Sequence, residues 1–197
     1  LGLQRAAGDR AEEADTLYAM SLTSLWQGRL DVGDSLADEA LALFQELGSR
    51  AGVGRGLFVK ASALFFRRDF EQTYAPWVES MNIAAECGDR ALELTMIAGL
   101  AALEHHLRRP DEALRVAQTG LERARQARNT HVVVWMLDLI AAFTAEASPV
   151  EAVVLAAAAE AVREKAGGGV LPEFLWIDDA QSVARRHLSS GELDEAW

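Results

Sequence analysis

The stretch Leu41-Ala-Leu43-Phe-Gln-Glu-Leu-Gly48-Ser-Arg50 returns forty residues later as Met81-Asn-Ile83-Ala-Ala-Glu-Cys-Gly88-Asp-Arg90. The first ten residues of the chain, Leu1–Arg10, match the same ending. Four blocks therefore align without a gap: 11–50, 51–90, 91–130 and 131–170. A fixed period of this length is typical of a solenoid, in which each unit buries its apolar face by stacking on its neighbours.

Each block contains two helical patterns separated by a short polar break. In the first block, Leu36, Ala40 and Leu43 follow the break at Gly28–Asp31 with the spacing of an amphipathic helix. A small residue recurs just inside each second helix, where two helices of a hairpin would approach most closely: Gly33, Thr73, Ala113 and Ala152. We therefore predict an all-α fold, a right-handed α-solenoid of helical hairpins with a period of 40 residues.

The two ends of the chain are predicted to lie outside the four hairpins. Residues 1–10 would be the end of a preceding repeat, and residues 171–197 a terminal helix with a truncated following helix. Glycines at 167–169 would stop the fourth hairpin, and Pro172 would restart a helix over about Glu173–Leu188. The sequence is thus expected to be an excerpt from a longer polypeptide.

Composition restricts the classes of partner. The chain has 19 Lys and Arg against 30 Asp and Glu, a net charge of −11, so we expect no nucleic-acid binding by this segment. No apolar run approaches the length of a membrane span, which predicts a cytoplasmic protein. The single cysteine, Cys87, fits a reducing compartment, and its repeat partners Leu47 and Ala127 predict a buried thiol.

One short motif suggests an enzyme. Gly33-Asp34-Ser35-Leu36 spells the block found in a family of serine esterases, but it lies in a helical pattern and no Asp-x-x-His occurs in the chain. We interpret the match as coincidence and predict no catalytic residue. A helical hydrolase using Ser35 or His106 is the enzyme alternative.

Two further motifs suggest bound groups. Gly52-Val-Gly54-Arg-Gly56 lacks both the third glycine of a dinucleotide loop and the Gly-Lys-Ser/Thr of a phosphate loop, so close helix packing is the preferred interpretation. In Glu104-His105-His106 the adjacent histidines point roughly 100° apart on a helix and cannot chelate one ion from the same face. We predict no metal site and no cofactor in this chain.

A file of aromatic side chains is the strongest candidate for ligand binding. Trp26, Phe66 and His106 occupy the same slot near the end of the first helix in successive repeats, and Phe65 and His105 fall in the slot before. First helices line the concave face of such solenoids, so these rings could form a groove for a peptide or an apolar small molecule. The alternative is that they pack between adjacent first helices.

A local basic stretch is the candidate for partner docking. Arg108, Arg109 and Arg115 lie within an acidic protein and could bind an acidic partner or a phosphorylated ligand. The alternative is a solvated face whose arginine stems cover apolar surface.

The repeat resembles a known family. A hairpin with Gly28 or Arg68-Asp69 between its helices is similar to a lengthened tetratricopeptide repeat, whose usual period is about 34 residues. The tail is more specific: Val154-Leu-Ala-Ala-Ala-Ala-Glu160-Ala-Val-Arg-Glu-Lys165, a Gly/Pro break, and Gly191-Glu-Leu-Asp-Glu-Ala-Trp197. It resembles the closing region of the repeat domain in large bacterial (actinobacterial) transcriptional regulators. These combine a signal-transducing ATPase, a tetratricopeptide-like array and commonly a LuxR-type helix-turn-helix.

This resemblance implies a function. The chain would be a non-enzymatic ligand- or protein-binding sensor module of a cytoplasmic transcriptional regulator. Its partners would be a protein or peptide, or a small-molecule inducer, together with covalently attached ATPase and DNA-binding domains. The ATPase motifs and DNA-binding helices do not occur in this sequence, and no ligand residue can be transferred. The main alternative is a protein–protein interaction scaffold unrelated to transcription.

Overall fold

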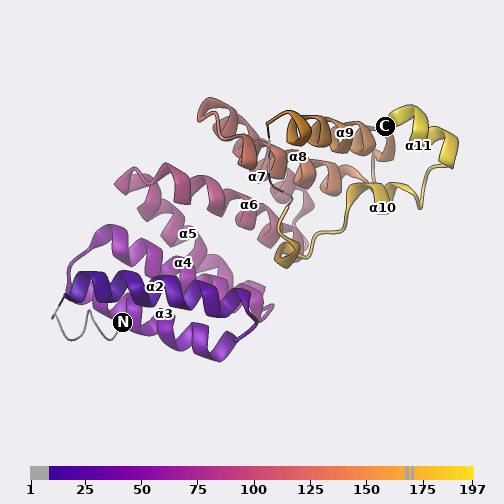
Figure 1. Ribbon diagram of the computed structural model, residues 1–197. Helices are drawn as coiled ribbons and strands as arrows, with labels where there is room; N and C mark the ends of the chain where they lie inside the picture. The colour runs from indigo at the N-terminus through magenta and orange to yellow at the C-terminus, as the bar shows by residue number, and fades with distance from the viewer. Residues whose placement is uncertain (1–8, 167–168, 170) are drawn as a thin grey trace. The chain divides into compact units, whose positions relative to one another are not determined.

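The chain folds as an array of helices. The computed structural model describes residues 9–166, 169 and 171–197, which form ten α-helices, one 3-10 turn and no strand (Figure 1). The predicted all-α helical repeat is therefore confirmed. Residues 1–8, where the end of a preceding repeat is predicted, lie outside the described residues.

The helices of the four hairpins begin close to every twentieth residue. The first helices are α2 (Arg10–Trp26), α4 (Arg50–Phe66), α6 (Arg90–His106) and α8 (Thr130–Thr144). The second helices are α3 (Leu30–Glu46), α5 (Phe70–Cys87), α7 (Pro110–Gln126) and α9 (Pro149–Ala166). First helices thus start 40 residues apart, at 10, 50, 90 and 130, which confirms the period read from the sequence.

One capping device starts each first helix. The side chains of Asp9, Ser49, Asp89 and Asn129 accept hydrogen bonds from the backbone N–H three residues further on, at 3.0, 3.1, 3.1 and 3.2 Å. Each bond satisfies a donor that the first turn of the helix would otherwise leave unpaired. The repeated block endings of the sequence are therefore the caps of the following helices.

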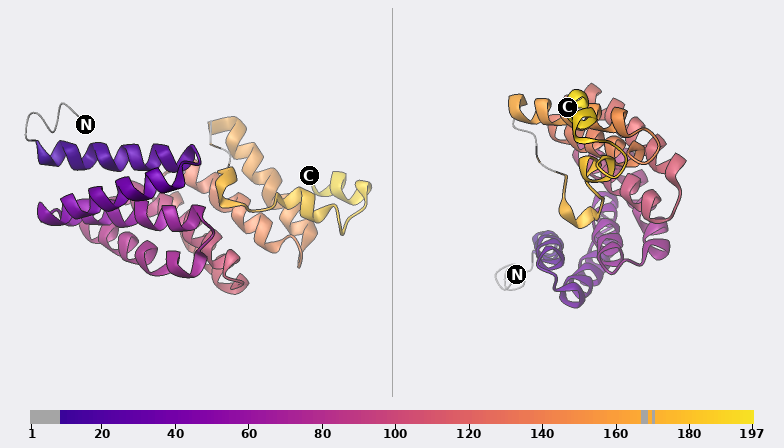
Figure 2. Two further views of the ribbon diagram at one scale, coloured as in Figure 1. Left: turned by 90° about the horizontal axis from the view of Figure 1, so that it is seen from below. Right: turned by 90° about the vertical axis from the view of Figure 1, so that its right-hand side faces the viewer.

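The described chain divides into two compact units, unit 1 ending at Glu93 and unit 2 running from Leu94 to Trp197. In unit 1, α2 packs on α3, α3 on α4 and α4 on α5, and α2 also contacts α4. Connections of three residues between these helices make neighbours antiparallel. Figures 1 and 2 show the four helices side by side.

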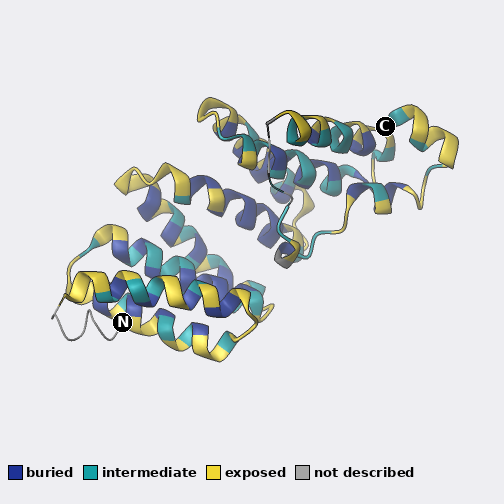
Figure 3. Cartoon of the chain, in the orientation of Figure 1, coloured by how far each residue is buried: buried dark blue, intermediate teal, exposed yellow. Residues whose placement is uncertain are grey.

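Small residues allow the close helix contacts that the sequence predicts. Gly33, Thr73, Ala113 and Ala152 are all buried. A Cβ atom on Gly33 would lie 2.6 Å from Leu25 Cδ2, and one on Gly54 would lie 2.7 Å from Ile83 Cγ2. The glycine run at 52–56 is therefore part of α4 and a packing surface. Figure 3 shows the result, helices with a buried face and an exposed face.

Unit 2 ends in short elements. α7 packs on α8 and α8 on α9, and the short helices α10 (Ala180–Ala184) and α11 (Ser190–Ala196) both pack on α9. The continuous helix predicted over 173–188 is absent from this described segment. A 3-10 turn at Glu173–Leu175 stops at Trp176, whose backbone is left-handed at φ 50° and ψ 43° and so cannot continue a right-handed helix.

The prediction of a buried thiol is wrong, because Cys87 is exposed. Its repeat partners are exposed as well, Leu47 to 41%. Leu47 and Ala127 are the C-caps of α3 and α7, and Cys87 is the last residue of α5. This repeat position therefore lies at the ends of helices, where an apolar residue need not be buried. Among the described helices, none combines the length and apolarity needed to cross a membrane.

Candidate functional site

The predicted aromatic groove residues of unit 1 differ in exposure. Trp26 is 64% exposed at the end of α2. Phe66 packs against a buried cluster that includes Val59. Phe65 is 2% exposed and meets Phe70 edge-on, with ring centroids 5.5 Å apart. Of the three, only Trp26 therefore presents most of its surface to solvent.

The two predicted histidines of unit 2 hold neighbouring segments together. Nε2 of His106 lies 2.8 Å from the carbonyl oxygen of Leu175, which ties the end of α6 to the 3-10 turn. The His105 ring stacks on Phe143 with centroids 5.0 Å apart and planes at 14°. Burial lowers the pKa of His105, and the nearby charges of His106 and Arg108 lower it further. At neutral pH His105 is thus an uncharged aromatic surface, and its use by a ligand stays a prediction.

Two of the three predicted docking arginines already contact carboxylates. Arg109 lies 3.3 Å from Glu104, whose side chain is 1% exposed. Arg115 donates two hydrogen bonds to Glu112, one of them 2.9 Å long. Arg108 ends α6 with left-handed backbone, at φ 60°. A partner would have to compete with these internal bonds or share them.

The esterase-like block takes part in packing and in an ion-pair network. Gly33 packs against Leu25. The carboxylate of Asp34 forms ion pairs with Lys60 Nζ at 2.8 Å and with Arg67 Nη1 at 2.5 Å. Burial raises the pKa of Asp34, but hydrogen bonds from Lys60 and Arg67 outweigh burial and bring the pKa below its ordinary value. All four histidines of the sequence lie beyond residue 104, so unit 1 offers no imidazole to activate Ser35.

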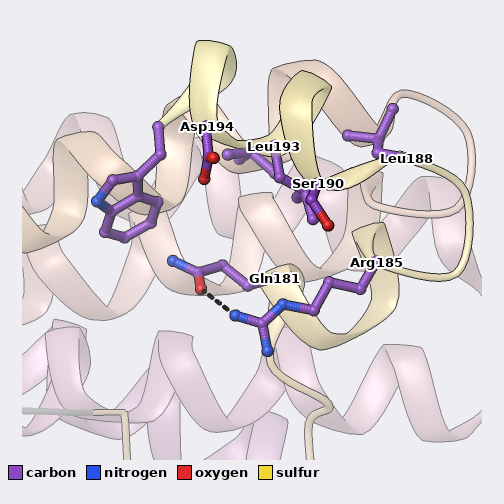
Figure 4. Close-up of a pocket in the computed structure, with 8 residues that line it drawn as sticks. Gln181, Arg185, Leu188, Ser190, Leu193 and Asp194 are labelled. Atoms are coloured by element: carbon purple, nitrogen blue, oxygen red, sulfur yellow. Dashed lines mark hydrogen bonds between the residues drawn. The ribbon is translucent and has the colours of Figure 1, made fainter.

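A groove that the sequence analysis did not predict lies in unit 2, between α9, α10 and α11 (Figure 4). It encloses about 600 Å³. We call it the C-terminal groove, and it is lined by Val153, Gln181, Arg185, Leu188, Ser190, Leu193, Asp194 and Trp197. Figure 4 shows Leu193 and Asp194 above the hollow, on α11, facing Gln181 and Arg185 below.

The C-terminal groove combines apolar surface with charges of opposite sign. Trp197 is 53% exposed, and Leu188 and Leu193 are half-buried. Arg185 and Asp194 stand on opposite walls, and Arg185 makes a long 3.5 Å hydrogen bond to Gln181. The arrangement can bury an apolar side chain and pair with both an acidic and a basic group.

The C-terminal groove lies where two short helices, α10 and α11, pack on α9. α10 has five residues, whereas α8 and α9 have 15 and 18. Besides Val153 of α9, the lining of the groove comes from α10, α11 and the residues that connect and follow them. The sequence signals that could have indicated this are Asp179 and Ser189, which both cap helices.

The described residues were also compared with the requirements of a metal site. No group of three or more His, Cys, Asp or Glu side chains in that part of the chain could hold a metal ion. Comparison with known proteins gives no relative, since no protein-family model matches the chain and no curated protein matches its sequence.

Proposed function

We propose that this chain is a binding module, in which the helical array presents the C-terminal groove to a segment of a protein partner. The observation that carries the proposal is the groove itself, a hollow of about 600 Å³ with exposed apolar side chains between opposite charges. Exposed tryptophan and arginine are the side chains that most often dominate protein interfaces. Trp197 and Arg185 both line this groove.

The chemistry of the groove suits a short amphipathic peptide. An apolar side chain of the partner would pack on Leu193 and Trp197, an acidic group would pair with Arg185, and a basic group with Asp194. The charges would fix the direction in which the peptide lies, because reversing it would place like charges together.

The regulatory context is a second part of the proposal, and it is supported by the sequence resemblance alone. In a cytoplasmic transcriptional regulator, occupancy of the groove would favour one conformation of the array. Attached ATPase and DNA-binding domains would respond to that preference. Nucleotide-binding and helix-turn-helix segments encoded on either side of this chain would support this context, and their absence would favour a free-standing scaffold.

Peptide selection tests the groove directly. A random 12-residue peptide library displayed on phage would be selected on the chain, and affinities measured by fluorescence anisotropy. We expect peptides that bind the chain with micromolar affinity and bind the Leu193→Glu variant at least about tenfold more weakly. The same substitution at an exposed leucine of unit 1, Leu47→Glu, should leave affinity unchanged.

A second variant distinguishes loss of binding from loss of structure. Leu193 is half-buried, so Leu193→Glu could disturb α11, whereas Arg185 is exposed. Arg185→Glu should weaken the binding of those selected peptides that are acidic, and it should leave the circular dichroism spectrum of the chain unchanged. Selected peptides that bind both groove variants as tightly as the original chain would overturn the proposal.

A further inference from the structure

A second hollow of unit 2 has a different chemical character. A cavity of about 440 Å³ lies where α8 and α9 meet the segment that leads into α10. We call it the acidic cavity, because five carboxylates line it: Asp138, Glu160, Glu173, Asp178 and Asp179. Among the described residues of this lining, Arg163 is the only one with a basic side chain. Five negative charges against one positive charge leave a formal −4.

Arg163 neutralises only one end of the acidic cavity. Its guanidinium lies 2.8 Å from Asp138 Oδ2 and also bonds Glu160. Burial raises the pKa of Asp138, and the charge and hydrogen bond of Arg163 only partly offset that effect. At the other end Asp178 is exposed and its ion pair with Arg186 is long, 3.9 Å.

Apart from Gln181, the rest of the cavity wall is apolar. Its apolar residues include Ala141, Ala156 and Ala180, together with Ile177 and Trp197. An aromatic face attracts a cation that is placed over it, and small apolar residues accommodate a hydrocarbon body. The cavity therefore offers both a negative potential and a surface that an apolar group can bury.

We propose that the acidic cavity binds a small organic cation, a protonated amine or quaternary ammonium with a hydrocarbon body. The volume lies within the range of small-molecule sites, roughly 300–1,000 Å³. A metal ion does not fit, since the carboxylates in the described part of unit 2 form no cluster able to hold one.

This proposal does not depend on peptide binding in the C-terminal groove. Gln181 and Trp197 line both hollows, but the carboxylates of the acidic cavity do not line the groove. Asp194 lines the groove and not the cavity. The two sites can therefore be tested by separate variants.

Calorimetric titration of the chain with benzyltrimethylammonium tests the proposal. We expect a dissociation constant below about 1 mM and no heat with benzenesulfonate, which has a similar size and the opposite charge. The double variant Glu173→Gln/Asp178→Asn should weaken binding at least about tenfold. Both side chains are exposed, so the variant should keep its melting temperature.

Two matched controls separate the cavity from general attraction to an acidic protein. Glu164→Gln removes an exposed charge of α9 outside the lining, and Asp194→Asn removes the carboxylate of the C-terminal groove. Both should leave the affinity for benzyltrimethylammonium unchanged. A dissociation constant above 10 mM, comparable binding of benzenesulfonate, or equal weakening by Glu164→Gln would each overturn the proposal.

Discussion

At the scale of the residue, the ends of helices α2 to α7 repeat more exactly than their sequences do. The backbone is left-handed at Gly28, Gly48, Arg68, Gly88, Arg108 and Arg128, one position in every twenty. In all six turns the following residue donates its N–H to the carbonyl five residues earlier, at 2.8–3.0 Å. This is the Schellman ending of a helix. Three arginines thus occupy a conformation that glycine adopts at lower cost.

We predict that Arg128→Gly stabilises the chain. Arg128 has φ 53° and is exposed, so glycine would relieve backbone strain without leaving a cavity. The gain should be about 0.5–1 kcal/mol, because the left-handed strain of about 1–2 kcal/mol is partly offset by the greater freedom of unfolded glycine. Urea unfolding followed by circular dichroism measures it. Arg125→Gly, which removes the same charge from inside α7, should instead destabilise by about 1 kcal/mol. A loss of stability in both variants would contradict the strain argument.

A second prediction concerns the charge of Asp34. Asp34→Asn should lower stability at pH 7 by about 1–2 kcal/mol, since Lys60 and Arg67 lose a half-buried anionic partner. The folded pKa of Asp34 lies below its unfolded value, so its stabilisation is present above about pH 4 and is lost as pH falls through the folded pKa.

Urea unfolding at pH 7, 5 and 3 checks this dependence on pH. The difference between the original chain and Asp34→Asn should shrink as the solution becomes more acidic. Asp31 binds the same Arg67, but its side chain is 99% exposed. Asp31→Asn should therefore have a much smaller effect at every pH. A difference for Asp34→Asn that stays constant from pH 7 to pH 3 would show that its charge is not the cause.

At the scale of the element, helices follow from sequence where local signals and the repeat agree. The starts of α2, α4, α6 and α8 follow from the forty-residue period, and Gly48 and Gly88 mark endings that the alignment already contains. Arg68 gives no such signal, because arginine has no local preference for the left-handed backbone that it adopts here, at φ 61°. The helix predicted over 173–188 failed for a similar reason: Trp176 has no local preference for the left-handed conformation that ends the 3-10 turn.

The candidate site was predictable only in part. Periodicity identified the slots of Trp26 and Phe66, but it could not tell an exposed ring from a packed one. The C-terminal groove depends on how α10 and α11 pack on α9. That is a property of the assembled helices, and the sequence pattern does not contain it.

The contact between α4 and α5 gives a prediction at this scale. Gly54→Ala should destabilise by about 1–3 kcal/mol, because its Cβ would lie 2.7 Å from Cγ2 of the fully buried Ile83. Isoleucine is stiff at its branched carbon and cannot move aside cheaply. Gly191→Ala is the matched control, since nothing lies within 4 Å of its Cβ position in α11. It should be neutral or stabilise by up to about 1 kcal/mol. Thermal unfolding of both variants measures these changes in stability. If both substitutions destabilise the chain, close packing of Gly54 against Ile83 is not the cause.

At the scale of the whole molecule, the repeat extends from the core to surface contacts. Arg10 pairs with Glu46, and one period later Arg50 pairs with Glu86 at 2.9 Å. Each pair joins the start of a first helix to the end of the second helix 36 residues on. Such exposed pairs contribute little energy. Their recurrence shows that the two helices of each hairpin in unit 1 are paired in the same way.

An array of this kind should lose stability locally, which leads to a last prediction. In a solenoid the stability is close to a sum of terms for each repeat and its neighbours, so damage at one position spreads only through adjacent contacts. Gly54→Ala weakens α4 against α5, and amide hydrogen exchange should therefore accelerate in α2–α5 of unit 1. Exchange in α8 and α9 of unit 2 should stay within error of the original chain. Mass spectrometry of peptic fragments resolves these segments. Equal acceleration in both units would show that the chain unfolds as one cooperative block and that its stability is not organised by nearest neighbours.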